Sequence, residues 1–274
     1  MGAIIIFWIG VSILIFYFLN QPKNLKIYYL NVGQGDSAYI RSPDGFDMII
    51  DGGPSNIVLS ELGSVMPFYD KKIDLMLITN PDKDHIAGLI DVLDRFEVSV
   101  VIEPGTTNDT ATFKVLEQKI KEEGAQHLLA YEGLDMYLGE ETSFKILFPD
   151  RDVSSWERND GSAVGLLTYG ENKFLFMGDG TILTESLVLE KHKDEISEID
   201  ILKAGHHGSK TSTGDALLSV AKPDFVIISA GKENSYGHPS GETLDRIKKV
   251  GSAILATYEG RVKVESDGTN VYIK

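Results

Sequence analysis

The sequence of 274 residues contains no cysteine and is short of basic side chains. The absence of cysteine excludes a disulfide framework, an iron–sulfur cluster, a thiolate-ligated zinc site and a cysteine nucleophile. Lys and Arg number 26 against 41 Asp and Glu, so the formal net charge is −15. This balance disfavours unaided binding to a nucleic-acid backbone, which needs a positive surface, and favours carboxylates that hold cations. Any metal must be held by oxygen and imidazole ligands.

An uncharged run at residues 3–19 is followed by a chain with the composition of a globular domain. As a helix the run would be roughly 26 Å long, close to the thickness of a bilayer core, which predicts a membrane anchor and short linker over residues 1–24. A cleaved signal peptide or a buried helix are the alternatives. Lys23 and Lys26 follow the run and favour a cytoplasmic domain by the positive-inside rule.

Short β-rich runs alternate with helical patterns over residues 25–274, without a Pro-, Gly- or Ser-rich linker or a fixed repeat. This predicts one α/β domain of two packed sheets with helices outside. Predicted strands are residues 26–31, 38–41, 48–50, 74–79, 98–102, 144–148, 163–168, 173–177, 199–202, 225–229 and 262–264, with one more near Ile254. Predicted helices are residues 86–93, 113–123, 215–220 and 242–250.

Polar residues follow several apolar runs, in turns flanked by glycine or aspartate. Four of the six histidines lie there, and so do four aspartates: His85, His206, His207, His238, Asp51, Asp82, Asp84 and Asp179. Converging carboxylates repel one another unless a cation lies between them, so a metal site is predicted. Asp82 and Asp84 could instead cap a helix, and the Gly33–Gly35 turn could serve only as a tight hairpin.

At these residues the sequence resembles the metallo-β-lactamase superfamily, in particular the β-lactamase-like domain of ComEC-type competence proteins for DNA uptake. The matching segments are residues 31–37 (NVGQGDS), 50–53 (IDGG), 80–85 (NPDKDH), 177–179 (MGD), 202–210 (LKAGHHGSK) and 236–239 (YGHP). The resemblance implies an αββα sandwich of two mixed sheets flanked by helices, with a metal site at its open edge. It also implies an extracytoplasmic domain, in conflict with the two lysines.

The resemblance further implies a set of metal ligands: Asn80, Asp82, Asp84, His85, Asp179, His206 and His207. The family's HxHxDH motif falls on residues 80–85, so Asn80 and Asp82 replace its two leading histidines. Asp179 matches the bridging carboxylate, and either His206 or His207 matches the last ligand. The family's middle histidine has no counterpart here, because residues 159–162 (NDGS) offer only oxygen.

Further roles follow from the same resemblance and from the chemistry of phosphate esters. Asp51 and Asp160 are expected behind the ligands, Asp84, His238 and Lys203 in catalysis, and Ser209, Lys210 and Asn159 against the substrate. Solvated surface is the alternative for both lysines. We expect one site for Mn²⁺ or Zn²⁺ and a second, oxygen-rich site that also suits Mg²⁺.

The sequence thus predicts a membrane-anchored, metal-dependent hydrolase, a phosphodiesterase or nuclease that acts on DNA in competence-type uptake or processing. A single span cannot form a channel, so DNA uptake would require a separate channel protein. One alternative, which the acidic chain favours, is a hydrolase of envelope phosphodiesters or phosphocholine esters. Another is a non-catalytic binding domain, which the replaced histidines favour.

Overall fold

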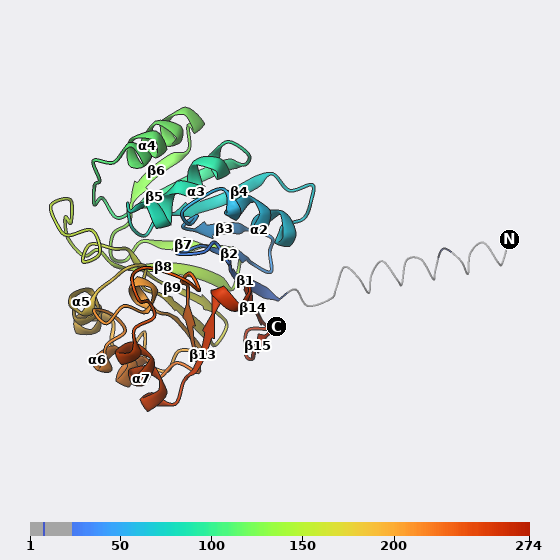
Figure 1. Cartoon of the computed structure of the whole chain (residues 1–274). Coiled ribbons are helices and arrows are strands. Elements are labelled where there is room, and N and C mark those ends of the chain that lie inside the picture. Colours follow the sequence, from blue (N-terminus) through green and yellow to red (C-terminus); the bar gives the residue numbers. More distant parts are fainter. Residues whose placement is uncertain (1–7, 9–23) are drawn as a thin grey trace.

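The computed structural model describes Trp8 and residues 24–274, in which two sheets pack face to face between two groups of helices (Figure 1). The predicted αββα sandwich is confirmed. The predicted membrane anchor lies outside the described residues except for Trp8, and among the described helices none is long and apolar enough to cross a bilayer.

The first sheet has eight strands in the order β15-β14-β1-β2-β3-β4-β5-β6. Their bounds are β1 Leu25–Tyr29, β2 Ala38–Arg41, β3 Asp47–Ile50, β4 Lys72–Leu77, β5 Glu97–Glu103, β6 Gln126–Leu129, β14 Val262–Ser266 and β15 Val271–Ile273. Helices α2 (Ile57–Val65), α3 (Lys83–Leu93) and α4 (Ala111–Glu123) connect the parallel strands β3 to β6.

The second sheet has seven strands in the order β13-β12-β11-β10-β9-β8-β7. Their bounds are β7 Asp135–Tyr137, β8 Thr142–Phe148, β9 Val164–Tyr169, β10 Asn172–Phe176, β11 Ile201–Lys203, β12 Phe225–Ile228 and β13 Ala253–Ala256. Helices α5 (Ile182–His192), α6 (Asp215–Ala221) and α7 (Gly241–Val250) connect its parallel strands, and short 3₁₀ turns lie at Gly205–Gly208 and Thr257–Glu259. Both sheets thus begin as antiparallel meanders and continue as parallel strands joined by helices, which parallel pairing requires.

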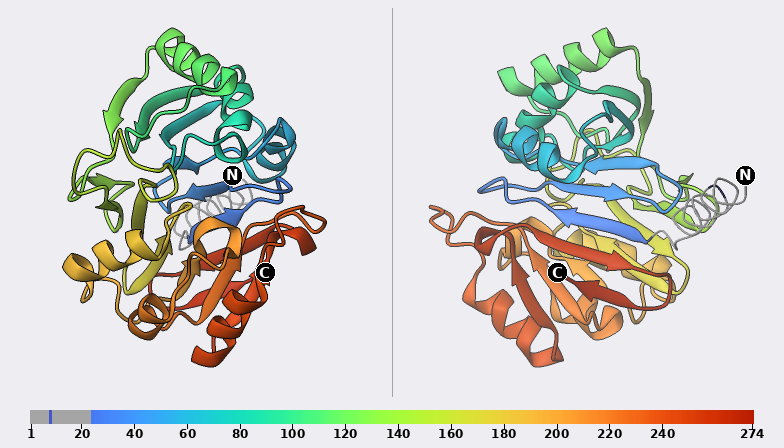
Figure 2. Two further views of the ribbon diagram at one scale, coloured as in Figure 1. Left: turned by 60° about the vertical axis from the view of Figure 1, so that its left-hand side comes forward. Right: turned by 90° about the vertical axis from the view of Figure 1, so that its right-hand side faces the viewer.

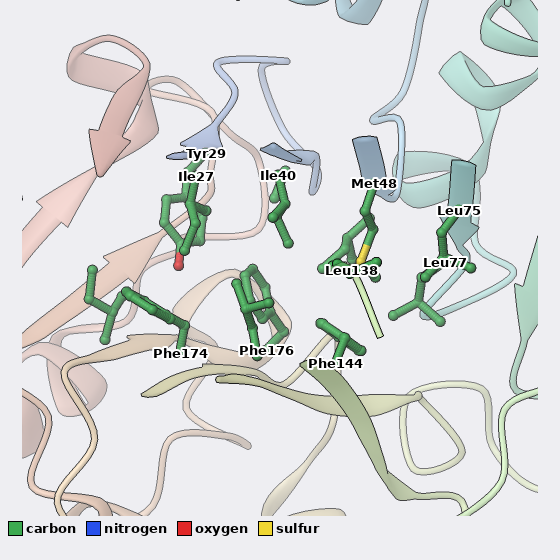
Figure 3. Close-up of a cluster of buried hydrophobic side chains, with 14 of the residues drawn as sticks. Ile27, Tyr29, Ile40, Met48, Leu75, Leu77, Leu138, Phe144, Phe174 and Phe176 are labelled. Atoms are coloured by element: carbon green, nitrogen blue, oxygen red, sulfur yellow. The ribbon is translucent and has the colours of Figure 1, made fainter. Parts of the chain in front are cut away.

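A hydrophobic core lies between the sheets, and two further cores lie under the helices. Figure 3 shows Ile27, Ile40 and Met48 of the first sheet facing Phe144 and Phe176 of the second. Outside the sandwich, α2 to α4 cover the first sheet and α5 to α7 the second, as both views in Figure 2 show. Burial on both faces explains why several strands are continuous apolar runs rather than alternating ones.

Five elements are missing from the sequence prediction: α2, α5, β6, β7 and β15. Helix α5 begins with Ile182 and Leu183, which are both half exposed, so its apolar residues do not form a single stripe. Strands β6 and β7 lie at sheet edges and carry mostly exposed side chains, which removes the alternation that would identify them.

Candidate metal centre

The site residues lie on loops at the carboxyl ends of neighbouring strands, where ligands of α/β proteins commonly bind. From the first sheet, Asp51 follows β3, and His85 lies in the first turn of α3 after β4. From the second sheet, Asp179 follows β10, and His207 follows β11. The sandwich therefore brings segments more than 100 residues apart to one edge.

His85 is buried and oriented by Asp51. Its Nδ1 lies 2.9 Å from Oδ2 of Asp51, and the same carboxylate accepts hydrogen bonds from the backbone N–H of Thr79 at 2.8 Å and from its hydroxyl. A carboxylate on Nδ1 holds the proton there and directs the lone pair of Nε2 to the other side of the ring.

His207 has the same arrangement with a different partner. Its Nδ1 lies 3.0 Å from Oδ1 of Asp36 and 3.0 Å from the carbonyl oxygen of Ser229. His206 and His207 have φ values of 45° and 54°, a left-handed conformation that costs a non-glycine residue of order 1–3 kcal/mol. Strain of this kind persists where the surrounding structure fixes a functional side chain.

The ring nitrogens left free by these contacts converge on two carboxylates. His85 Nε2 lies 3.1 Å from Asp179, and His207 Nε2 lies 3.2 Å from Asp84 and 3.6 Å from Asp179. Both Nε2 atoms and Oδ1 of Asp179 are buried without a hydrogen-bond partner. One ligand atom each from Asp84, His85 and His207 lies within 4.8 Å of the others. Buried, unpartnered imidazole and carboxylate atoms at this spacing fit a divalent cation.

The pKa values of the cluster also indicate that positive charge is needed between its carboxylates. Burial lowers the pKa of His207, but Asp179 and Asp36 outweigh it and raise this pKa to about 10. Burial raises the pKa of Asp179, and His85 and His207 outweigh it, so that this pKa lies well below its usual value. The carboxylates thus stabilise positive charge between them, which protons or a metal ion can supply.

Asp36 also lies near this cluster, within 4.8 Å of ligand atoms of His85 and Asp179. However, both of its oxygens have protein partners, since Oδ1 contacts His207 and Oδ2 lies 2.7 Å from Nζ of Lys203. We therefore interpret Asp36 as the orienting partner of His207. Sequence alone predicts no role for this residue.

At the two positions where the family has its leading histidines, the side chains of this chain contact other protein groups. The amide of Asn80 donates to Asn159 and to Ser162, and its oxygen accepts from the backbone N–H of Asp82. Asp82 precedes α3 at its N-cap position but caps no N–H group; its carboxylate is 2.6 Å from Arg158 and 2.9 Å from Asn108. Neither residue belongs to the cluster around His85 and His207.

Of the two candidates for the last ligand, the geometry favours His207. His206 Nε2 is 4.0 Å from Asp179, and this side chain is 25% exposed at the cleft. His238 also lines the cleft, with its ring 5.4 Å from that of His206. Burial, then His206 and His207, lower the pKa of His238 below its usual value.

The structure does not bring four other predicted residues to the cluster. Lys203, the last residue of β11, is buried, forms an ion pair with Asp36 and does not line the cleft. Ser209 is buried against Thr211. Asp160 accepts from Thr181, and with Lys210 it lines a neighbouring hollow. The predicted phosphate-facing role of Lys203 is therefore replaced by a buried ion pair, whereas Asn159 does line the cleft.

A cleft of about 330 Å³ opens in front of the cluster. Its lining includes residues that the sequence analysis missed: Gln34, Lys83, Asn108, Thr110, Arg158 and Tyr236. Tyr236 is 69% exposed, and its ring is nearly parallel to that of His238, with 6.0 Å between the centroids. Tyr236 stands in the YGHP segment and could have been found there, whereas nothing in the sequence places Arg158 beside Asp82.

Comparison with known proteins supports this reading of the fold. The profile of the metallo-beta-lactamase superfamily matches residues 30–232. ComE operon protein 3 of Bacillus subtilis is 29% identical over 90% of this chain and 34% of its own length. Recombination protein 2 of Haemophilus influenzae is 28% identical over 92% of this chain and 30% of its own length. Competence protein ComA of Neisseria gonorrhoeae is 23% identical over 86% of this chain and 31% of its own length. The chain thus spans about a third of these relatives.

Solved structures share the fold at low sequence identity. CmlA, a diiron beta-hydroxylase from Streptomyces venezuelae, has a TM-score of 0.57 and 16% identity over 90% of this chain and 55% of that one. Zn²⁺-bound PqqB from Methylobacterium extorquens has a TM-score of 0.55 and 11% identity over 84% of this chain and 97% of that one. With the sandwich, the ordered motifs and the profile match in agreement, the chain belongs to the metallo-β-lactamase superfamily.

Proposed function

We propose that this chain is a metal-dependent phosphodiesterase that cleaves nucleic-acid strands. The observation that carries the proposal is the cleft itself, which is lined by His207 and Asp179, with their unpartnered ligand atoms, and also by Arg158 and Tyr236. The ligand atoms would hold a cation, Arg158 would contact phosphate, and the ring of Tyr236 offers a flat surface for a base.

The charge of the cleft supports a cation-dependent reaction. Its acidic side chains are Asp82, Asp84 and Asp179, and its basic ones are Lys83 and Arg158, with His207 as a third cation while it is protonated. The cleft therefore has no net positive charge of its own that would attract a phosphodiester anion. A divalent ion held by Asp84, His85, His207 and Asp179 would offset this charge and, when bound, supply a Lewis acid and an activated water.

The protein's own side chains would then bind and orient the substrate. Arg158 offers a planar guanidinium to phosphate oxygens, although one of its nitrogens is shared with Asp82. His238, whose lowered pKa keeps its ring neutral near pH 7, lies beside His206 and is placed to hydrogen-bond a leaving oxygen. The loop that carries it is braced by Asn234, which donates to the carbonyls of Gly231 and His238.

Tyr236 favours a nucleotide over the phosphocholine alternative. Stacking of a base on an exposed aromatic ring is worth about 1–3 kcal/mol and tolerates any base. A quaternary ammonium group is usually held by several aromatic rings, whereas Tyr236 is the only Phe, Tyr or Trp among the described residues that line the cleft.

Three substrates with the same leaving group test the proposal: thymidine 5′-(4-nitrophenyl phosphate), methyl 4-nitrophenyl phosphate and 4-nitrophenyl phosphocholine. We expect Mn²⁺-dependent release of nitrophenol that EDTA and His85→Ala abolish. Tyr236→Leu should lower kcat/KM about tenfold for the thymidine ester alone. Tyr137→Leu is the matched control, since Tyr137 is similarly exposed on β7 outside the cleft.

Other results would support the competing functions. A choline ester that is preferred, and that Tyr236→Leu impairs, would replace the nucleic-acid proposal by one of phosphocholine hydrolysis. The absence of metal-dependent turnover with all three esters and with single-stranded DNA would indicate a non-catalytic domain. One observation favours that outcome: Asn80 and Asp82 are already bonded to protein groups, which leaves fewer ligands for a second ion.

We further propose that residues 1–24 attach the domain to a membrane and that it acts with a separate channel protein in DNA uptake. The uncharged run at residues 3–19 and the competence-protein names of the relatives support this proposal. Extraction of a membrane fraction with alkaline carbonate provides the test, since release of the full chain into the supernatant would contradict an anchor.

A further inference from the structure

The loop between β1 and β2 contacts the segments that carry the candidate ligands Asp84, His85 and His207. Sequence alone allowed this loop, Gly33–Ser37, to be no more than a tight turn. In the structure Gln34 accepts at Oε1 from the backbone N–H of Gly231 at 2.9 Å, and the hydroxyl of Ser37 donates to the carbonyl of Asp51 at 3.0 Å. One loop thus holds the segment after β12 and the segment after β3.

Gly35 brings the same loop against the segment that carries Asp84 and His85. A Cβ atom on Gly35 would lie 2.2 Å from the carbonyl oxygen of Asp84, and φ of 144° also favours glycine here. The close approach lets the backbone N–H of Asp36 donate to that carbonyl at 3.2 Å. The carbonyl of Asp36 accepts in turn from the backbone N–H of Gly53 at 2.8 Å.

The side chain of Asp36 extends this network to the second sheet. Its carboxylate joins His207 Nδ1 at 3.0 Å and Lys203 Nζ at 2.7 Å, and Lys203 also donates to the carbonyl of Ala204 at 2.8 Å. All three side chains are buried. An uncompensated charge at such depth is strongly unfavourable, so Lys203 allows Asp36 to remain ionised beside the imidazole.

We propose that Asp36, held in place by Lys203, is a positioning residue that orients His207 toward the metal, and that residues 34–37 fix the ligand-bearing loops relative to one another. The inference concerns the metal site and holds whatever the substrate is. Outer partners of this kind typically change metal affinity 10- to 100-fold. Because Ser229 also accepts from His207 Nδ1, we expect the lower end of that range.

Two double variants of the full chain separate the hydrogen bond from the ion pair. Asp36→Asn with Lys203→Met is uncharged and keeps an oxygen that can accept from His207. Asp36→Ala with Lys203→Met is uncharged and keeps no acceptor. We expect the first to bind Mn²⁺ with an affinity close to that of the parent, and the second about tenfold more weakly, as measured by titration calorimetry.

The ¹H chemical shift of the His207 Nδ1–H group gives a second readout, since its hydrogen bond to the side chain at position 36 is kept in the first variant and lost in the second. Arg41→Met with Asp47→Asn is the control, because it removes a partly buried ion pair of 2.7 Å elsewhere and should leave Mn²⁺ affinity unchanged.

Equal Mn²⁺ affinity in the two double variants would overturn the proposal. If the alanine variant fails to fold, Asp36→Asn with Lys203→Met decides the question, because it leaves no unpaired buried charge. Its Nδ1–H signal should be retained, and loss of that signal would contradict a positioning role.

Discussion

The candidate metal centre has two halves, which differ in whether their polar side chains already have protein partners. In one half, His85, His207 and Asp179 keep buried ligand atoms without a hydrogen-bond partner. In the other, Asn80 and Asp82 are bonded to neighbouring protein groups. The difference shows that a replaced ligand position is not left vacant, because its polar group acquires a protein partner, as a part-buried polar group requires.

The comparison also concerns charge. Asp82 already has a permanent cation beside it, the guanidinium of Arg158, whereas the partners of Asp179 are imidazoles, which can give up a proton when a metal ion binds. A first divalent ion would therefore enter a preformed site, and a second would have to compete with Arg158. This sharpens the expectation of two unequal sites that the sequence suggested.

The largest expected effect comes from removing a ligand of the preformed half. His85→Ala should abolish tight binding of Mn²⁺ and with it the stabilisation by metal, which is about 2.7 kcal/mol at 100 times Kd in the parent. Thermal unfolding with Mn²⁺ and with EDTA measures this. His192→Gln is the control, because His192 is buried among Glu132 and Glu195 outside the site and should keep the shift.

Gly35→Ala should loosen the preformed half without removing a ligand. The added Cβ meets a backbone oxygen at 2.2 Å, so the loop must move, at an expected cost of about 1–3 kcal/mol. Denaturant unfolding and Mn²⁺ titration should both register the change. Gly33→Ala is the matched control: its φ of 84° also favours glycine, but a Cβ there meets nothing within 4 Å, so Mn²⁺ affinity should not fall.

The loop after His207 depends on Glu185, whose carboxylate accepts from the backbone N–H groups of Thr213 and Gly214. Burial raises the pKa of Glu185 to about 7 from its usual value of 4.5. Between these values the folded state binds more protons at Glu185 than the unfolded state does. The contribution of this group to stability is therefore fully present below pH 4.5 and falls as pH rises toward 7.

Glu185→Gln should remove up to about 2–3 kcal/mol of this decline between pH 4.5 and 7. Denaturant unfolding at several pH values checks it. An unchanged slope in the variant would show that Glu185 ionises in the folded state as readily as in the unfolded chain.

The smallest effect concerns the half that Arg158 occupies. Arg158→Gln frees Asp82 from a solvent-accessible ion pair worth at most about 1 kcal/mol, so binding of a second Mn²⁺ should strengthen by no more than about fivefold. Calorimetric stoichiometry measures it. Arg151→Gln, which removes a comparable pair with Asp150, should have no effect. A second ion that binds more weakly without Arg158 would contradict the competition.

Much of the fold could be predicted from the sequence. The apolar runs before Asp51, Thr79 and Asp179 are long enough to identify buried strands, and their order gives the two-sheet class. Elements with half-exposed surfaces, such as α5 and β7, were missed because their burial comes from neighbours that local periodicity does not report.

The residue types of the candidate site were predictable from the sequence, but the contacts between them were not. The sequence by itself determined which side chains stand at strand ends, that no thiolate is available, and that two histidine positions carry Asn80 and Asp82. Only the tertiary structure decided that His207 rather than His206 faces Asp84, that Lys203 is buried against Asp36, and that Arg158 neutralises Asp82. The physical reason is that a polar group at a strand end takes whichever partner the packing of distant segments brings to it, as Asp36 and His207 show across 171 residues.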